Sequence, residues 1–277
     1  MPSQSKQVVL SAAFDDLRSR HIRLLQEAAL HGPVTVWLWP DAMVQERTGR
    51  PPKFGQDERL YLVRSIRHVA DAQLLQSLAE PGTLPAQAPL GSAVWAVDPD
   101  SDSPSQRAQC TRHGWEYLVL RGERSVPLQE PTEWASASPT GRKKVVVTGC
   151  YDWLHSGHVR FFEEVSAYGD LYVILGRDEN IRLLKGEGHP LVGQDERRYV
   201  VGAIRFVKAA LFGTGRGWLD AEPEIGHLRP DIYAVNEDGD KGGKREFCAQ
   251  RGIQYLVLKR EPATGLPRRT STDLRGF

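Results

Sequence analysis

The chain repeats itself over most of its length. Residues 55–69 and 193–207 are identical at ten of fifteen positions, and both segments begin with Gly-Gln-Asp-Glu-Arg. The offset of 138 residues also aligns residues 117–120 with residues 255–258. Solenoid units repeat at about 20 to 50 residues, so a period this long predicts two copies of a whole domain.

Each copy alternates β-branched runs with segments of helical spacing, in the order strand, helix, strand, connection, helix, strand, helix, strand. This alternation predicts a parallel sheet with helices on both faces. We therefore expect an α/β protein of two tandem Rossmann-like domains, residues 1–124 and 144–277. Residues 125–143 are rich in Pro, Ser and Thr without a period, which predicts a linker.

One segment of the second copy is suited to binding phosphate. It follows the valine run 145–147 and contains two histidines, His155 and His158, at the expected start of a helix. Side chains three residues apart project to the same side of a helix. The N–H groups and dipole at a helix start attract phosphate, and Gly157 leaves room for a ligand to approach the backbone. The segment therefore predicts a nucleoside triphosphate site.

The segment His-Ser-Gly-His at 155–158 resembles the HxGH motif of the nucleotidyltransferase superfamily, in its cytidylyltransferase-like branch. Four further segments resemble motifs of that family and occur in the same order, namely residues 149–152, 177–186, 194–197 and 269–272. The resemblance covers residues 144–276. It implies a nucleotidyltransferase domain in the second half of the chain.

The resemblance also implies roles for individual residues. His155 and His158 would donate hydrogen bonds to the phosphates, and Lys185 would bridge the two anionic reactants. The expected nucleotide-binding residues are Thr148, Gly149, Cys150, Tyr151, Asp152, Gly157, Arg197, Asn236, Asp238, Arg269, Thr270, Ser271 and Thr272. The expected contacts to the second substrate come from Asp152, Asp178, Lys185 and Trp218.

Some of these residues have a second interpretation. Asp152 could share a divalent ion, most simply Mg²⁺, with the phosphates, or it could cap its own turn. Lys185 could be a solvated lysine after a helix, and Trp218 could be a packing residue. Cys150 lies in the phosphate turn, but the chemistry needs no covalent nucleophile. The protein's task would be electrostatic, because an oxyanion attacks the α-phosphorus and pyrophosphate leaves.

Two departures from the family pattern affect the choice of nucleotide. Gly265 stands where the family has an arginine before its Ser-Thr-Thr segment, and Arg269 is the candidate replacement. Residues 236–240 replace a glycine-Asp-Asp type turn. The sequence favours CTP, because the acidic and Lys-Gly segments and the duplication resemble ethanolamine-phosphate cytidylyltransferases. ATP is the alternative, since heptose-phosphate and flavin adenylyltransferases share the motif.

The second substrate is expected to be a small phosphorylated or phosphonate compound. A third hypothesis makes the chain an inactive nucleotide sensor or scaffold, which the intact histidine motif disfavours. In the first copy, Arg18 and Arg20 replace the first histidine and the glycine, which predicts an inactive domain. We expect that domain to serve as an intramolecular pseudo-dimer partner, with a homodimer also open. A competing hypothesis is a regulatory anion site built from Arg18, Arg20 and Arg59.

Composition limits the remaining classes. The formal net charge of +1 disfavours a general nucleic-acid binder. Three cysteines and a start without signal-like character favour a reducing, cytoplasmic setting. No apolar run has the length of a membrane span.

Overall fold

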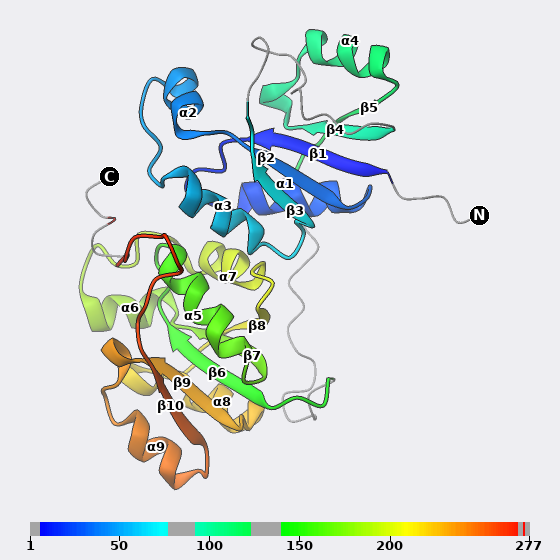
Figure 1. Cartoon of the computed structure of the whole chain (residues 1–277). Coiled ribbons are helices and arrows are strands. Elements are labelled where there is room, and N and C mark those ends of the chain that lie inside the picture. The colour runs from blue at the N-terminus through cyan, green and yellow to red at the C-terminus, as the bar shows by residue number, and fades with distance from the viewer. Residues whose placement is uncertain (1–5, 77–91, 123–139, 271–273, 275–277) are drawn as a thin grey trace. The chain divides into compact units, whose positions relative to one another are not determined.

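The computed structural model of the protein describes residues 6–76, 92–122, 140–270 and 274. The chain forms two compact units, Met1–Val126 and Pro127–Phe277 (Figure 1). Each unit contains one five-stranded sheet, and the strand pairs of both sheets are parallel. The α/β fold predicted from the alternating pattern is therefore confirmed.

The first unit has the sheet order β3-β2-β1-β4-β5. Its elements along the chain are β1 (Gln7–Ala12), α1 (Ser19–Ala29), β2 (Val34–Leu38), α2 (Asp41–Thr48), α3 (Gln56–Arg64), β3 (Asp71–Leu74), β4 (Ala93–Val97), the 3₁₀ turn η1 (Pro99–Ser101), α4 (Pro104–His113) and β5 (Glu116–Val119).

The second unit has the equivalent order β10-β9-β6-β7-β8. Its elements are β6 (Lys144–Gly149), α5 (Ser156–Ser166), β7 (Asp170–Leu175), α6 (Asp178–Lys185), α7 (Gln194–Gly202), β8 (Val207–Phe212), η2 (Gly217–Leu219), α8 (Glu222–Leu228), β9 (Ile232–Asn236), η3 (Glu237–Gly239), α9 (Lys244–Gln250) and β10 (Gln254–Leu258).

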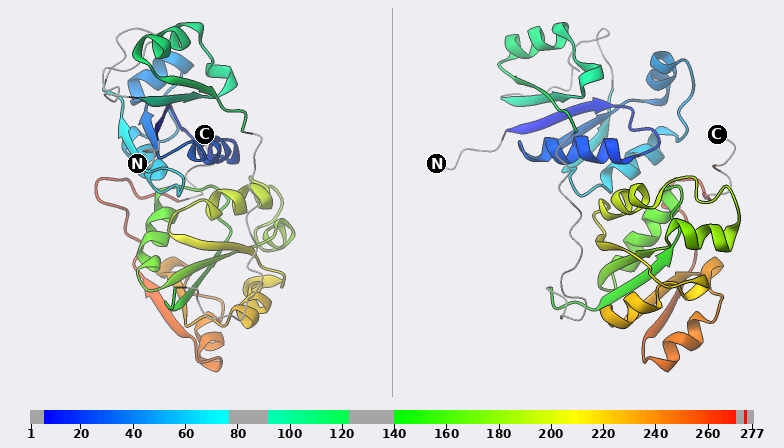
Figure 2. Two further views of the ribbon diagram at one scale, coloured as in Figure 1. Left: turned by 90° about the vertical axis from the view of Figure 1, so that its right-hand side faces the viewer. Right: turned by 180° about the vertical axis from the view of Figure 1, so that it is seen from behind.

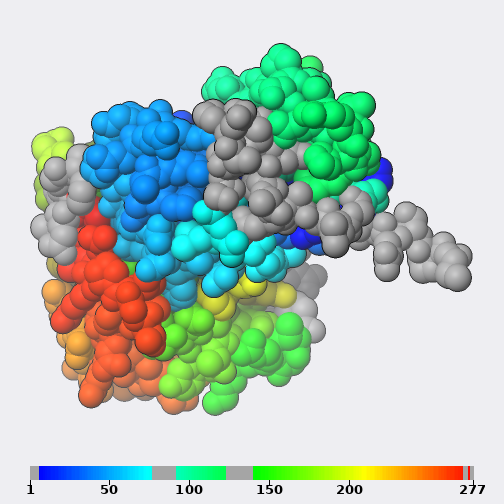
Figure 3. Space-filling model, turned by 45° about the horizontal axis from the view of Figure 1, so that its top comes forward, coloured from blue at the N-terminus to red at the C-terminus, as the bar shows by residue number. Residues whose placement is uncertain are grey.

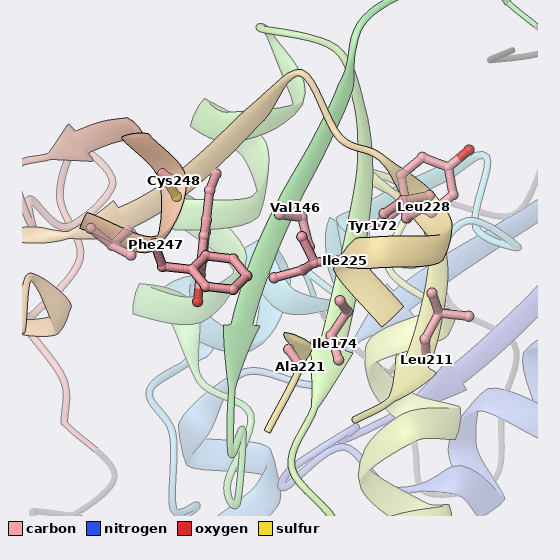
Figure 4. Packing of buried hydrophobic residues seen from close by; sticks show 11 residues of the cluster. Val146, Tyr172, Ile174, Leu211, Ala221, Ile225, Leu228, Phe247 and Cys248 are labelled. Carbon is pink, nitrogen blue, oxygen red and sulfur yellow. The ribbon is translucent and has the colours of Figure 1, made fainter. Parts of the chain in front are cut away.

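The central strand β6 is buried on both faces, as its valine run requires. One face of the sheet packs against α8 and α9, where Val146 and Ile174 contact a cluster that includes Ile225 and Phe247 (Figure 4). Helices α5 and α7 lie on the opposite face (Figure 2), and α6 packs beside η2. Both units thus have a three-layer arrangement in which the carboxyl ends of the strands meet at one edge.

In the first unit the corresponding core is rich in tryptophan. The rings of Trp37 and Trp95 lie 5.7 Å apart, and those of Trp95 and Trp115 lie 6.4 Å apart, measured between centroids. All three side chains are buried, and Cys110 of α4 packs in the same cluster. The cluster fills the space between the sheet and α4.

The two units differ by one residue at the same connection. The sequence pattern predicts a connection without regular structure after the second strand of each copy. The structure has the short helices α2 and α6 there. The loop that follows has seven residues in the first unit, 49–55, and eight in the second, 186–193. Equivalent residues are therefore 137 positions apart before this loop and 138 apart after it.

A shared glycine shows how closely the duplicated backbones agree. A Cβ atom on Gly32 would lie 2.1 Å from the carbonyl oxygen of Lys6, and one on Gly169 would lie 2.1 Å from that of Lys143. Only glycine permits this approach before the second strand of each sheet. Across the described ranges, no helix has the length and apolarity needed to cross a bilayer.

Candidate active site

The turn between β6 and α5 places His155 at the N-cap of the helix. Its side chain has no exposed surface, and its Nδ1 accepts a hydrogen bond from the backbone N–H of Gly157 at 3.1 Å. An accepting Nδ1 places the proton of a neutral ring on Nε2. A Cβ on Gly157 would lie 3.1 Å from the His155 ring, so the glycine permits this bond. His155 is therefore a fixed hydrogen-bond donor through Nε2.

His158 stacks on His155, with ring centroids 3.9 Å apart and an angle of 23° between the planes. Its other side meets Tyr151, whose ring lies edge-on at 5.2 Å. Tyr151 has a φ of 51°, an unusual conformation that turns its ring back over Gly149. The sequence prediction that the two histidines act on one group is consistent with this stacked arrangement.

Burial lowers the pKa of His158 to about 3, with smaller contributions from the positive charges of Arg260 and Lys185. The ring is therefore neutral at pH 7, and its single N–H is engaged by the backbone of Trp153, a bond that raises the pKa slightly. The charge of Lys185 at the end of α6 also acts on the Cys150 thiol, although burial dominates there and raises the pKa of that thiol. A thiol that stays protonated is a poor nucleophile. The protonated thiol argues against a covalent step at Cys150.

Arg260 is a site residue that sequence comparison does not reveal. It lies just after β10, and its side chain is only 19% exposed. Its positive charge lowers the pKa of His158. Nη2 donates to the carbonyl oxygen of Arg269 at 2.9 Å, and Nη1 is paired with the carboxylate of Asp238. The family comparison points to Gly265 and Arg269 instead, because extra residues separate Arg260 from the Thr270 segment. Only the folded chain brings Arg260 to the histidines.

The segment between Arg260 and Thr270 continues over the histidine turn. A Cβ on Gly157 would lie 3.6 Å from the carbonyl oxygen of Arg269. Figure 3 shows this segment, coloured red, on the surface of its unit. His155 is therefore enclosed by residues from both ends of the second domain.

Arg197 lies beneath the site. Its side chain is 0% exposed, and its guanidinium donates to the carbonyl oxygens of Val192, Cys150 and Gly176 at 2.9, 2.5 and 2.9 Å. It also pairs with Asp178 at 2.7 Å. The resemblance predicts that Arg197 binds nucleotide and that Asp178 contacts the second substrate. The contacts show that the pair holds three backbone segments together below the site, and the two binding roles stay predictions.

The first unit contains the same network. Arg59 donates to the carbonyl oxygens of Phe54, Ala13 and Trp39 at 2.9, 2.6 and 2.8 Å and pairs with Asp41 at 2.7 Å. Its side chain is also 0% exposed. This unit lacks the first histidine and the glycine of the motif. A network present in both copies is therefore part of the fold, and it excludes Arg59 from the anion site considered from the sequence.

A second set of hydrogen bonds, from backbone N–H groups to an aspartate, also occurs in both units. Oδ1 of Asp152 accepts a hydrogen bond from the backbone N–H of Val192 at 2.9 Å, and Asp15 accepts from the N–H groups of Lys53 and Phe54 at 2.8 and 3.1 Å. Asp152 is 6% exposed. These bonds give Asp152 a structural role that differs from both interpretations of the sequence, because the carboxylate holds the loop before α7 and the bonded N–H lies outside its own turn.

Other predicted residues are placed as follows. The hydroxyl of Thr148, near the carboxyl end of β6, lies 2.7 Å from that of Tyr233 in β9. Asn236 ends β9 and caps η3, which contains Asp238, and Trp218 is 61% exposed on η2. Ser271 and Thr272 lie outside the described residues.

The equivalent turn of the first unit is occupied by its own side chains. Arg18 and Lys53 both pair with Asp16, at 2.9 and 3.2 Å. Trp39 stands where the second unit has Gly176, and its indole N–H donates to Ser11 at 2.9 Å across the ends of β1 and β2. An indole in this position takes up room that the second unit leaves open.

Both units keep a partly buried histidine at the second motif position, and this predicts a pH dependence of stability. Burial lowers the pKa of His21 to about 4, and that of His158 is about 3. The unfolded value is near 6.5, so the stabilising contribution is complete above pH 6.5 and is lost as the pH falls toward these folded values. We expect the free energy of unfolding to fall by up to about 1.4 kcal/mol per pH unit per histidine below 6.5. Urea unfolding at pH 7.5, 6 and 5 measures this, and His21→Gln must flatten the slope.

The described residues contain no cluster of three histidine, cysteine or acidic side chains arranged for a metal. Mg²⁺ is commonly held by substrate phosphates, waters and one or two carboxylates, without a cage of protein ligands.

Comparison with known proteins agrees with the family resemblance of the second copy. The family model described as cytidylyltransferase-like matches residues 146–275. An FAD synthase of Ferroglobus placidus is 38% identical over 120 residues, which cover 42% of this chain and 75% of that protein. The bifunctional protein HldE of Geobacter sulfurreducens is 42% identical over 71 residues, 25% of this chain and 14% of that protein.

A solved structure of a lipopolysaccharide core biosynthesis protein from Thermoplasma volcanium aligns over 44% of this chain and 99% of its own, with 22% identity and a TM-score of 0.39. The motif, the parallel sheet and the extent of the FAD synthase match lead to one assignment. The chain belongs to the cytidylyltransferase-like family of the nucleotidyltransferase superfamily.

Proposed function

We propose that the second unit transfers a nucleoside monophosphate from a nucleoside triphosphate to the phosphate or phosphonate of a small acceptor and releases pyrophosphate. The observation that supports this most strongly is the fixed, stacked pair of His155 and His158 at the start of α5, with Arg260 and Lys185 close enough to act on it. These groups are donors and cations, which stabilise a phosphoryl transition state.

The chain's own residues would divide the work. His155 donates from Nε2 to a phosphate oxygen, His158 stacks on the His155 ring and holds it in place, and Arg260 neutralises the triphosphate. Lys185 holds the acceptor's anionic group near the α-phosphorus. Mg²⁺, when bound, neutralises charge on the phosphates. Because His155 is enclosed, nucleotide entry requires the segment from Arg260 to Thr270 to move.

Adenylyl transfer from ATP is the form of the reaction that the relatives favour. An FAD synthase, by its name, makes a dinucleotide that contains adenine, and the one compared above is 38% identical to this chain over 120 residues. Cytidylyl transfer from CTP is the second candidate. It is supported by the family model and by the tandem organisation, which resembles that of ethanolamine-phosphate cytidylyltransferases.

We propose that the first unit does not catalyse the reaction. Arg18 and Arg20 replace His155 and Gly157, and Trp39 stands in place of Gly176. Retention of the buried Arg59 network supports a role for this unit as a folded partner domain of the pseudo-dimer.

The test is pyrophosphate release with ATP, CTP, GTP or UTP and Mg²⁺, against phosphorylated alcohols and sugars, phosphonates and a flavin phosphate. Release with one nucleotide that also requires one acceptor establishes the reaction and both substrates. Release with CTP alone would replace adenylyl by cytidylyl transfer. Nucleotide binding without release from any acceptor would remove the enzymatic assignment in favour of a binding protein.

A further inference from the structure

The 3₁₀ turn η3, which follows β9, holds Arg260, two residues after the end of β10. Asp238 lies in η3, and its carboxylate is paired with Nη1 of Arg260. The neighbouring Glu237 accepts a weaker hydrogen bond from the backbone N–H of Arg260 at 3.4 Å. The arginine is therefore held at both its backbone and its side chain by the same 3₁₀ turn.

This contact fixes the direction of a side chain that otherwise has four rotatable bonds. Nη1 is directed to Asp238 and Nη2 to the carbonyl oxygen of Arg269. A guanidinium carries five N–H donors in a planar fork, so two fixed partners set the plane in which the remaining donors point. The charge of this fork acts on His158. The contacts that orient the guanidinium of Arg260 therefore orient a positive charge near the histidine pair.

The exposure of the two partners argues against a role in stability. The Asp238 side chain is 50% exposed, whereas that of Arg260 is 19% exposed. An ion pair with one solvated partner contributes at most about 1 kcal/mol to stability. The same pair matters more for ligand binding, because preorganisation of a donor lowers the cost of ordering it in the complex.

We infer that Asp238 is a positioning residue, which acts on the triphosphate through Arg260 and makes no contact with the nucleobase. This inference rests on the proposed function and refines it. Residues 236–240, which differ from the family's glycine-Asp-Asp type turn, then change how Arg260 is held and do not select the base.

The decisive comparison is between Asp238→Asn and Asp238→Ala in the full chain. Both variants lose the negative charge, so any general electrostatic effect on an anionic ligand is common to them. Asparagine retains an oxygen that can accept from Nη1, and alanine does not. The probes are ATP, CTP and inorganic tripolyphosphate, each with Mg²⁺, and the readout is the dissociation constant from calorimetry.

We expect Asp238→Ala to bind tripolyphosphate about tenfold more weakly than Asp238→Asn, with the same ratio for the nucleotides. In an Arg260→Met background the two Asp238 variants must bind alike. Thermal unfolding should place both single variants within about 2 °C of the parent, since an exposed pair contributes little.

Equal affinity of the Asn and Ala variants in the parent background would overturn the inference. A ratio confined to one nucleotide and absent with tripolyphosphate would also overturn it, by assigning Asp238 to the base. Because these readouts are binding constants, they stand apart from the proposed reaction, which fails only if no acceptor supports pyrophosphate release.

Discussion

Replacing His155 with alanine is expected to lower the rate constant of pyrophosphate release at least about 100-fold, with a much smaller change in nucleotide KM. Loss of one preorganised donor to a transition-state oxygen typically costs a factor of about 100 to 1,000. His155 is suited to that role because the N–H of Gly157 occupies its Nδ1 and leaves the ring proton on Nε2. Steady-state kinetics with the nucleotide and acceptor found in the substrate panel measure the effect.

The duplicated fold supplies the matched control. Arg18 occupies the place of His155 in the first unit, so Arg18→Ala changes the equivalent N-cap without touching the histidine pair. That variant should retain the parent rate within about twofold. A rate for His155→Ala within threefold of the parent would remove this histidine from the mechanism, and loss of activity in Arg18→Ala would show that the first unit takes part.

Replacing Arg197 with methionine should cost about 3 to 5 kcal/mol in the unfolding free energy of the second unit. The substitution removes the guanidinium donor from three carbonyl oxygens, in one buried and two partly buried bonds, and from Oδ1 of Asp178. Arg59→Met should have a similar effect on the first unit, whose network has the same four contacts. Urea unfolding, followed separately for each unit, measures both.

The paired design separates folding from binding. Each substitution should shift one transition and leave the other within about 0.5 kcal/mol. A loss below 1 kcal/mol for Arg197→Met, accompanied by a large fall in nucleotide affinity, would return Arg197 to the nucleotide-binding role predicted from the family resemblance.

The fold class could be predicted because both of its determinants are local. The valine run at 145–147 and the ten identities between residues 55–69 and 193–207 need no knowledge of distant contacts. The same holds for His155, which lies a few residues from the glycine that orients it. Helix α2 escaped prediction, since this eight-residue helix shows only two turns of a weak period.

The roles of Arg197 and Arg260 could not be predicted, because each depends on residues far away in the chain. Motif position alone cannot show that Arg197 faces three carbonyl oxygens inside the unit. Arg260 reaches the histidines only through the ordering of strands, which places β10 next to β9 and β9 next to β6. Extra residues lie between Arg260 and Thr270, so the spacing of the family motif does not lead to Arg260.

The tryptophan core of the first unit has an optical consequence. Indole rings separated by 5.7 and 6.4 Å couple their electronic transitions, so Trp37, Trp95 and Trp115 should give the first unit an intense near-ultraviolet circular dichroism band. Among the described residues of the second unit, the tryptophans are the buried Trp153 and the 61% exposed Trp218. The dichroism therefore reports on one domain, while quenching of exposed indole fluorescence by acrylamide reports on the other. Ligand binding and unfolding can thus be assigned to a domain without any label.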